Sequence, residues 1–338
     1  MKTWPILAGT LFLATHRGPA ETAVGGACDT DPERAAARAE AEYTERTALI
    51  ENGPGLLRRR ADLLGGGVPT IAPVPALDDE EWWLPGTALG GAGPPRPAAV
   101  PAITSLLKWT DGRPLRWKQS SVGTAAHPDP AVAAETALLE TLERHAVRRV
   151  WHGTARLEAV DAHLEPALPE GVRAELDRAG LAVRVWRIHD DLPVSAVLAA
   201  VLRRDKEQIT FGACARRAAD LRPAVRHAVC EAVSVRAALA NASSDPAEVA
   251  RPREMARRQN DFLDHLSAME VPVAHPADPA ATADLGAAVA RRFGADPVAA
   301  DLSPREGPPV VRVVIPHPEF LLPADSESRY ALSPGYIE

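Results

Sequence analysis

Two stretches of the sequence share one pattern and decide the fold. Residues 31–46 are DPERAAARAEAEYTER and residues 129–144 are DPAVAAETALLETLER, so both follow D-P-x-x-A-A-x-x-A-x-x-E-x-x-E-R without a gap. Aspartate followed by proline is a helix start signal, because the carboxylate can cap free N–H groups and proline has no N–H to lose. The alanines recur at helical spacing, which predicts a narrow face suited to close packing on a sheet. Both stretches are therefore predicted to be helices.

A third, weaker copy of the pattern begins at Asp220. Its alanines and Glu231 hold the same positions as in the first two copies, but the final E-R pair is missing. Each copy follows a run that is typical of a strand and a glycine turn, at residues 22–26, 120–123 and 208–212. Repeated strand–turn–helix units predict an α/β (α+β) fold on antiparallel or mixed sheets, with pseudo-twofold symmetry between the first two units.

The whole chain, residues 1–338, is assigned to a single domain built on these units. The assignment is 1–50 for the first repeat, 51–105 for a partly ordered Gly- and Pro-rich connection, 106–180 for the second repeat, and 181–338 for the third unit and C-terminal part. Apolar runs predict further strands, and helical periodicity predicts further helices. The strands are Ile6–Thr15, Leu181–Ile188, Val194–Leu202 and Val310–Ile315, and the helices are Gly55–Leu64, Pro169–Ala179, Ala247–Met269 and Pro279–Phe293.

Composition excludes several classes of protein. With 46% hydrophobic and 25% charged residues, the chain has the composition of a globular protein and not of a disordered one. A formal net charge of -7 disfavours binding to nucleic acids or anionic membranes, so we expect neither as a partner. The three cysteines, Cys28, Cys214 and Cys230, have no zinc spacing and are interpreted as buried thiols.

The N-terminal apolar stretch has some features of a signal peptide. Pro5, Gly9 and Thr10 interrupt it, so a strand is favoured over a signal sequence. No apolar run reaches the roughly 18 residues of a membrane span. We therefore expect a cytoplasmic protein.

The last residues of the first two copies are candidate ligands. They are Glu42, Glu45 and Arg46 in the first copy, and Glu140, Glu143 and Arg144 in the second. Positions i, i+3 and i+4 share one face of a helix, so each set points in one direction. A single set would be an ordinary solvated face with a weak ion pair. Repetition in the same helical phase instead favours a shared site, in which carboxylates bind Mg²⁺ and arginines bind phosphate.

The position of E-x-x-E-R at the end of both stretches predicts how the two helices meet. Their C-terminal ends should face each other, with Glu42 and Glu140 on opposite sides of a shared cleft. Four carboxylates next to the negative ends of two helices are unfavourable without cations. This predicts that Mg²⁺ with nucleotide stabilises the protein.

These segments resemble the YcaO family, ATP-dependent enzymes that activate backbone amides. The blocks that carry the resemblance occur in the family's order: Gly25 to Arg46, Trp83 to Gly86, Val100 to Ala102, Ser121 to His145, Phe211 to Ala232, and Val310 to Pro316. The resemblance implies a YcaO-like fold over nearly the whole chain. It also implies ATP and Mg²⁺ as cofactors, with Glu42, Glu45, Glu140 and Glu143 as metal ligands, and Arg46 and Arg144, together with Glu42 and Glu140, as nucleotide ligands. It does not identify a catalytic residue.

Several positions depart from the family's pattern, so the ATP motif is degenerate. The turn Gly25-Gly26-Ala27 stands where the family has Gly-Lys-Gly, and Arg38 stands where it has serine. The family's Ser, Glu and Gln before the second E-x-x-E-R correspond to Ala125, Val132 and Thr136. One metal carboxylate and some polar nucleotide contacts of the family are therefore missing.

The resemblance leaves two functions open. The first is an enzyme that matures a ribosomally made peptide by forming an azoline, a thioamide or an amidine. The second is a degenerate subunit of the same fold that binds the precursor peptide or a partner enzyme without turning over ATP. Either function implies a precursor peptide and a leader-binding or companion maturation protein as partners, in a homodimer or a hetero-oligomer.

Overall fold

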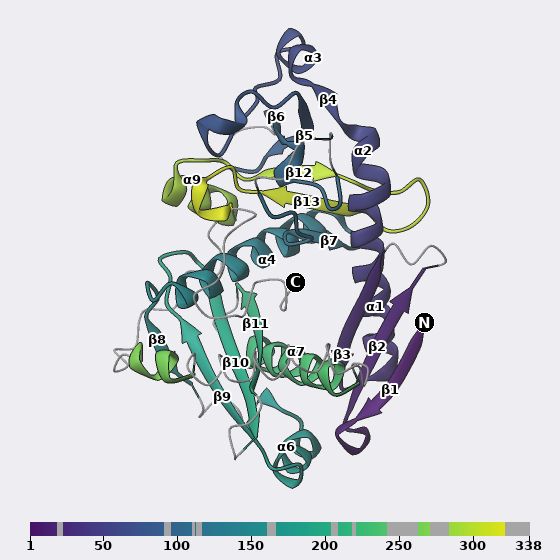
Figure 1. Cartoon of the computed structure of the whole chain (residues 1–338), viewed down its shortest axis with the longest axis vertical. Helices are drawn as coiled ribbons and strands as arrows, with labels where there is room; N and C mark the ends of the chain where they lie inside the picture. The colour runs from purple at the N-terminus through teal and green to yellow at the C-terminus, as the bar shows by residue number, and fades with distance from the viewer. Residues whose placement is uncertain are drawn as a thin grey trace.

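Three antiparallel sheets, each with a helix against it, carry the fold of the computed structural model (Figure 1). The structure describes residues 1–18, 23–90, 96–109, 112, 117–160, 167–203, 209–217, 221–241, 263–270 and 284–321. The mixed α/β architecture that the repeated units predicted is confirmed. None of the helices in this described part has both the length and the apolar character needed to cross a bilayer.

The first sheet has the order β1-β2-β3, with α1 (Pro32–Thr47) packed on it. Its strands are β1 (Lys2–Ile6), β2 (Leu11–Arg17) and β3 (Val24–Asp29). The prediction of one strand over Ile6–Thr15 is wrong, because the chain reverses direction at a 3₁₀ turn, Leu7–Gly9. All three turn residues have positive φ, and only Gly9 favours that conformation, so the sequence signals the turn weakly.

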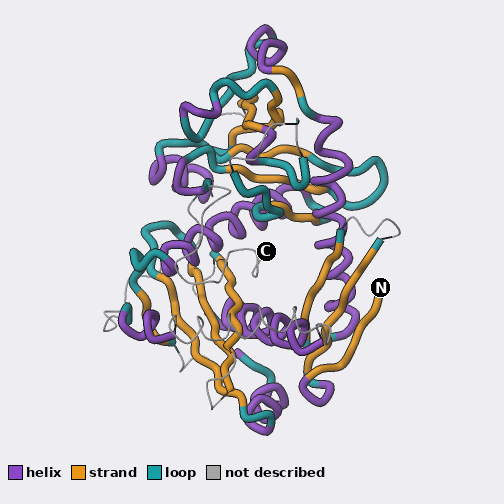
Figure 2. Tube along the Cα trace, viewed as in Figure 1, coloured by secondary structure: helices purple, strands orange, loops and turns teal. Residues whose placement is uncertain are grey.

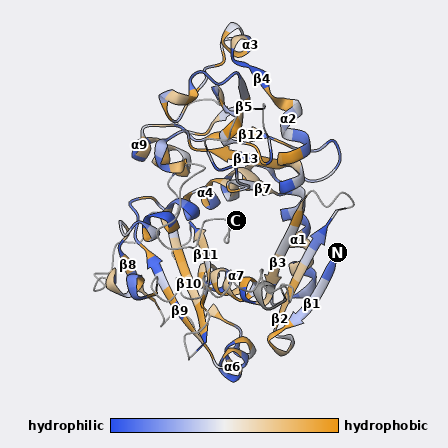
Figure 3. Ribbon diagram, in the orientation of Figure 1, coloured by the Kyte–Doolittle hydropathy of each residue, from blue (hydrophilic) through white to orange (hydrophobic). Residues whose placement is uncertain are grey.

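The second sheet has the order β11-β10-β9-β8 and is covered by α7 (Arg222–Asn241). Its strands are β8 (Leu157–Ala159), β9 (Leu181–Ile188), β10 (Ser195–Arg203) and β11 (Ile209–Arg216). The strands predicted at Leu181–Ile188 and Val194–Leu202 are confirmed. Residues 195–202 of β10 are all buried, and this central strand is among the most hydrophobic segments in Figure 3.

The third sheet has six strands and packs on α4 (Pro130–Trp151). They are β4 (Arg58–Arg59), β5 (Trp82–Ala88), β6 (Arg96–Pro101), β7 (Thr124–Ala126), β12 (Val298–Asp301) and β13 (Val310–Val314). The strand predicted at Val310–Ile315 is confirmed. Residues 51–105 appear in the sequence only as a connection, yet they supply β4, β5 and β6, because β5 pairs with β12 more than 200 residues later.

The two repeated helices begin as the sequence predicts. The Asp31 side chain accepts hydrogen bonds from the backbone N–H groups of Glu33 and Arg34, and the Asp129 side chain accepts one from Ala131. Both prolines lie in the first turn. The third copy forms α7, although Asp220 lies outside the described residues.

The shorter helices follow the sequence less closely. They are α2 (Gly53–Leu56), α3 (Arg60–Gly65), α6 (Glu170–Arg178) and α9 (Leu285–Phe293). The helix predicted at 169–179 is confirmed as α6. The helix predicted at 55–64 is wrong, because Arg58 and Arg59 pair with β5 and separate α2 from α3. Helix α9 begins after its cap Asp284 rather than at Pro279, which lies outside the described residues, as does most of Ala247–Met269.

Glycines let each helix approach its strand closely. Gly25 and Gly212 lie inside β3 and β11, so the glycine turns predicted there are wrong. A Cβ atom would lie 1.9 Å from the Ala39 carbonyl oxygen if placed on Gly25, and 2.2 Å from the Ala228 carbonyl oxygen if placed on Gly212. Gly123 does form a turn, with φ +82°, but its strand β7 follows it instead of preceding it.

Each sheet and the long helix packed on it form one unit: α1 and β3 belong to the first unit, α4 and β7 to the second, and α7 and β11 to the third. The three units meet around one centre (Figure 2). Helix α1 contacts β7 of the second unit, α4 contacts β11 of the third, and α7 contacts β3 of the first. Each helix therefore packs on its own strand and also touches the strand of another unit. The contacts join three units, whereas the pseudo-twofold relation between the first two stays a prediction.

Candidate nucleotide site

A cavity of about 380 Å³ lies at the centre of the three units. Side chains of α1, α4 and α7 line it together with residues of β3, β7 and β11. Its charged residues are the carboxylates Glu42, Glu45, Glu140, Glu143 and Glu231 and the arginines Arg38, Arg46, Arg144 and Arg216. We call it the central cavity.

One glutamate of each helix is held by the backbone of its own unit, in a strand for Glu42 and Glu231 and in the turn before β7 for Glu140. In each case a carboxylate oxygen accepts a hydrogen bond from a backbone N–H at or next to the glycine of close approach. The pairs are Glu42 with Gly26 (2.5 Å), Glu140 with Gly123 (3.0 Å) and Glu231 with Ala213 (2.7 Å). The same position of the repeat thus has the same backbone contact three times, and that contact fixes the orientation of the carboxylate.

The second glutamate of the pattern reaches into the next unit. Glu45 of α1 accepts the N–H of Ala126 in β7 at 2.8 Å, and Glu143 of α4 accepts the N–H of Ala215 in β11 at 3.0 Å. A buried charge-assisted hydrogen bond of this kind is stronger than a neutral one. These two bonds tie neighbouring units together at the wall of the central cavity.

The arginines of the pattern contact the glutamates. The Arg46 guanidinium lies 2.6 Å from Glu42 and also donates to the Val24 carbonyl oxygen at 2.5 Å. Arg144 lies 3.6 Å from both Glu143 and Glu231. Both arginines therefore offset part of the negative charge of the cavity wall.

Burial and the neighbouring charges shift the pKa values of the carboxyl groups. The pKa of Glu140 is raised to about 7, first by burial and then by the charge of Glu143, against the opposing effect of Arg144. Burial likewise raises the pKa of Glu231 to about 7. The pKa of Glu45 lies well above its usual range because of burial and the charge of Glu140. Carboxylates in such a setting favour a bound cation.

The donor set fits Mg²⁺. It consists of carboxylate oxygens, which are hard ligands, and Glu45 and Glu140 each use only one oxygen for the hydrogen bond to a strand. Within the described ranges, no three His, Cys, Asp or Glu side chains form a ready-made metal cluster. Mg²⁺ commonly takes one or two protein carboxylates and completes its shell with water and phosphate oxygens. The wall therefore suits a metal that arrives with a phosphate ligand.

The structure brings all six sequence-predicted site residues to the same cavity. Glu42 and Glu140 both line it, as the shared cleft required. The predicted meeting of two helix C-termini is wrong for both helices. Helical turns continue beyond Arg46 as far as Leu56, and α4 continues to Trp151, seven residues beyond Arg144. The negative charge of the wall therefore comes from side chains rather than from the ends of both helices.

Sequence reasoning missed part of the cavity wall. The sequence pattern could have identified Glu231, because it occupies in the third copy the position that Glu42 and Glu140 occupy in the first and second copies. Arg216 and His227 carried no signal, since only the tertiary fold brings them to the site. Arg38, noted only as a departure from the family pattern, lies 3.0 Å from His227 Nδ1 and donates to the Cys28 carbonyl oxygen.

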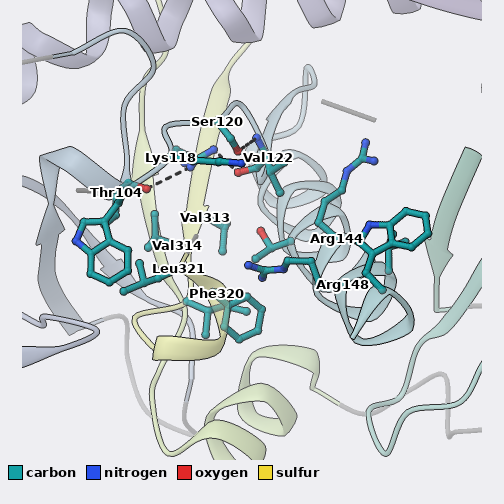
Figure 4. A pocket seen from close by; sticks show the side chains of 16 residues that line it. Thr104, Lys118, Ser120, Val122, Arg144, Arg148, Val313, Val314, Phe320 and Leu321 are labelled. Carbon is teal, nitrogen blue, oxygen red and sulfur yellow. Dashed lines mark hydrogen bonds between the residues drawn. The ribbon is translucent and has the colours of Figure 1, made fainter. Parts of the chain in front are cut away.

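A second, more apolar pocket adjoins the central cavity and shares Arg144 with it. Figure 4 shows it between α4, which carries Arg144 and Arg148, and β13, which carries Val313 and Val314. Its volume is only about 80 Å³. Such a pocket admits a small apolar group and is too small for a nucleotide.

The buried thiol and histidine near the site are structural. Burial raises the pKa of Cys214 to about 12, so this thiol is not a nucleophile at neutral pH. His145 lies 2.8 Å from Glu319 and stacks on Phe320, away from the central cavity. Neither group is therefore a candidate nucleophile, and the charged wall is suited to binding and charge stabilisation.

Comparisons with known proteins identify the family and the fold. Residues 67–319 match the model of a family described as YcaO cyclodehydratase, ATP- and Mg²⁺-binding. The match begins after α1, so the first E-x-x-E-R rests on the sequence pattern and the fold. No curated protein sequence matches the chain.

Solved structures share the fold over almost the whole chain. YcaO from Methanopyrus kandleri, bound with AMPPCP and Mg²⁺, is 20% identical with a TM-score of 0.70, covering 94% of this chain and 85% of that one. The E. coli microcin synthetase McbBCD complex with pro-MccB17 bound is 15% identical with a TM-score of 0.66, covering 93% and 87%. A heterocyclase in complex with substrate and cofactor is 17% identical with a TM-score of 0.64, covering 90% of this chain and 49% of that one. The present chain thus spans about half the length of that heterocyclase.

Proposed function

Because the chain belongs to the YcaO family, we propose that it uses ATP and Mg²⁺ to activate backbone amides of a ribosomally made peptide. The observation that carries the proposal is the central cavity, where five glutamates and the arginines Arg46 and Arg144 converge from three helices. This wall has the charges that a triphosphate with divalent cations requires.

The proposed reaction begins with attack of a neighbouring nucleophile on the amide carbon. The amide oxygen then takes the γ-phosphoryl group, and the bond to the ADP oxygen breaks. Loss of phosphate forms the C=N bond of an azoline or amidine, or leaves a thioamide when sulfur is delivered from outside. Phosphoryl transfer of this kind depends mainly on positioning and charge stabilisation, so the wall does not need to supply a nucleophile.

Different side chains of the protein would bind the metal and the phosphate. Glu42, Glu45, Glu140 and Glu143 would hold Mg²⁺, and Glu231 joins this set from the structure. Mg²⁺ neutralises phosphate charge. Arg46 and Arg144 would bind phosphate oxygens. The backbone hydrogen bonds of the glutamates keep the carboxylates in place before nucleotide arrives, which is the pre-organisation that such a site needs.

Calorimetric titration of Mg²⁺–AMPPCP into the full-length protein tests the site. We expect micromolar affinity for the wild type and a loss of at least thirtyfold in Glu140→Ala. Glu135→Ala is the matched control, because Glu135 is an exposed residue of the same helix that pairs with Arg217 outside the cavity. Equal affinities of wild type and Glu140→Ala would show that the site assignment is wrong. With a precursor peptide in hand, the same pair of variants is compared for peptide-dependent ATP consumption.

The second candidate function is a subunit that binds peptide without ATP turnover. The observation that favours it is the cavity wall itself, where Ala125 and Thr136 stand at positions that are polar in the family pattern. Arg38, which replaces a serine of the family pattern, also occupies the wall. Absence of Mg²⁺–AMPPCP binding at millimolar concentration would favour this function over catalysis, and micromolar binding would eliminate it. A companion maturation protein is proposed in both cases.

A further inference from the structure

A second charged cavity opens next to the central cavity. Its volume is about 300 Å³, and the N-terminal halves of α1 and α7 form its walls. We call it the basic cavity. It shares Arg38, Arg216 and His227 with the central cavity, so the two spaces are neighbours across these three side chains.

Arginines dominate the basic cavity. Arg34 and Arg38 of α1, Arg216 of β11 and Arg226 of α7 line it, and Asp29 is its only carboxylate among the described residues. Asp29 is already engaged, since it lies 3.0 Å from Arg34 and 3.4 Å from Arg38. Neither Arg216 nor Arg226 forms an ion pair with any described side chain. Within the described part of the chain, the charges of these two arginines are therefore not offset by an ion pair.

The pKa of His227 is affected by this excess of positive charge. The pKa of His227 lies well below its usual range, first because of burial and then because of the charges of Arg38, Arg216 and Arg144. The contribution of the three arginines, which comes second to burial, places the imidazole in a positive potential. An anion placed beside it would gain from that potential.

The cavity is open to solvent at its outer end. The Arg34 side chain is 61% exposed, and Arg226 is also exposed. Along α1 the charge changes sign, from Arg34 and Arg38 to Glu42 and Glu45 one to three turns later. The glutamate wall, where the proposed nucleotide would lie, therefore begins directly behind the arginines that the two cavities share.

We propose that the basic cavity is a subsite for the side-chain carboxylate of an acidic residue in the substrate peptide, close to the amide that is activated. The assignment rests on the proposed function and names its substrate class as peptides with an acidic residue near the modified position. A guanidinium matches a carboxylate in a bidentate geometry, and four of them line this cavity. Inorganic phosphate has the same anionic chemistry, so the test separates the two ligands.

The test is ligand-observed NMR on the full-length protein with two peptides, acetyl-Gly-Glu-Gly-amide and acetyl-Gly-Gln-Gly-amide, each with and without Mg²⁺–AMPPCP. We expect the glutamate peptide to bind and the glutamine peptide to bind at least fivefold more weakly. Arg226→Gln should weaken binding of the glutamate peptide about fivefold, as expected for loss of one partly exposed ion pair. Arg226→Glu should weaken binding of the glutamate peptide further and abolish its advantage over the glutamine peptide.

Arg291→Gln is the matched control, because Arg291 is an exposed residue of α9 outside both cavities. Equal binding of the glutamate and glutamine peptides would overturn the proposal. So would inorganic phosphate that binds in an Arg226-dependent way while the two peptides bind alike, since the cavity would then be a phosphate subsite.

The proposed function fails by a different result. A wild-type protein that does not bind Mg²⁺–AMPPCP in calorimetry contradicts the nucleotide site. An Arg226-dependent preference for the glutamate peptide without nucleotide would still support the basic cavity as a carboxylate subsite.

Discussion

The Glu140 carboxyl group makes the nucleotide-free protein sensitive to pH. Its pKa of about 7 in the folded protein lies above the ordinary value of 4.5 that it takes in the unfolded chain. The folded state therefore holds the proton more tightly, and stability is lost as pH rises from about 5 to about 7.5. The carboxyl groups of Glu45 and Glu231 shift in the same direction.

Glu140→Gln should remove part of this pH dependence. In urea unfolding with EDTA, we expect the wild type to lose stability between pH 5 and pH 8, and the variant to lose about 2 kcal/mol less, because the amide has no proton to release. Glu135→Gln on the exposed face of α4 should behave as the wild type. Parallel curves for wild type and Glu140→Gln would contradict the raised pKa.

Packing of a helix on its strand depends on single glycines. Gly25 of β3 is buried under α1, and a Cβ atom there would lie 1.9 Å from the Ala39 carbonyl oxygen. Backbone cannot give way as a flexible side chain can. The neighbouring Gly26 is exposed, and a Cβ atom there would meet only the Ala14 carbonyl oxygen at 3.9 Å.

The two glycines therefore predict opposite outcomes. Gly25→Ala should lower the free energy of unfolding by about 2 kcal/mol or more, because the overpacked atom forces α1 away from β3. Gly26→Ala should change it by less than about 0.5 kcal/mol. Chemical denaturation of both variants measures the difference. A tolerated Gly25→Ala would mean that α1 does not lie this close to β3.

Local signals in the sequence predicted the elements that carry the site. Asp–Pro starts and regular alanines identify α1 and α4, and segments rich in apolar residues identify β9 and β10, because each signal lies within the element itself. The turn at Leu7–Gly9 and the strands between residues 51 and 105 were missed. The turn places leucine and alanine at positive φ, which the sequence does not signal. The strands depend on pairing with β12, far along the chain.

The candidate site was predictable as far as the repeat extends. Glu42, Glu45, Glu140 and Glu143 occupy repeated positions on helices, so periodicity alone placed them together. Glu231 retains that position without the following E-R pair. Its place in the site is shown by the hydrogen bond that it accepts from the Ala213 N–H. Arg216 lies at the end of a strand and has no counterpart in the pattern, so only the packing of three units reveals it.

At the scale of the whole molecule, the central cavity couples three units that are separate in sequence. Glu45 binds the N–H of Ala126, and Glu143 binds that of Ala215, so a ligand that holds these glutamates also holds β7 and β11. Binding that orders one unit should therefore order the others.

Hydrogen exchange measures this coupling. We expect Mg²⁺–AMPPCP to slow amide exchange in β3, β7 and β11 together, because each strand donates an N–H to a glutamate of the cavity wall. Strand β6 lies outside the cavity and should be unaffected. Protection confined to a single unit would contradict a shared site. Chelation of Mg²⁺ with EDTA should reverse the protection in all three strands.

The closure of the three units also has a consequence for synthesis on the ribosome. Leu11 and Cys28 pack in one hydrophobic core with Val229, Cys230 and Val233 of α7. About 200 residues separate the two parts of this core, which at roughly 5–20 residues per second is about 10–40 s of translation. During that interval the nascent first sheet exposes apolar surface that α7 helps to cover in the folded protein. We therefore expect the growing chain to bind chaperones until α7 has left the exit tunnel.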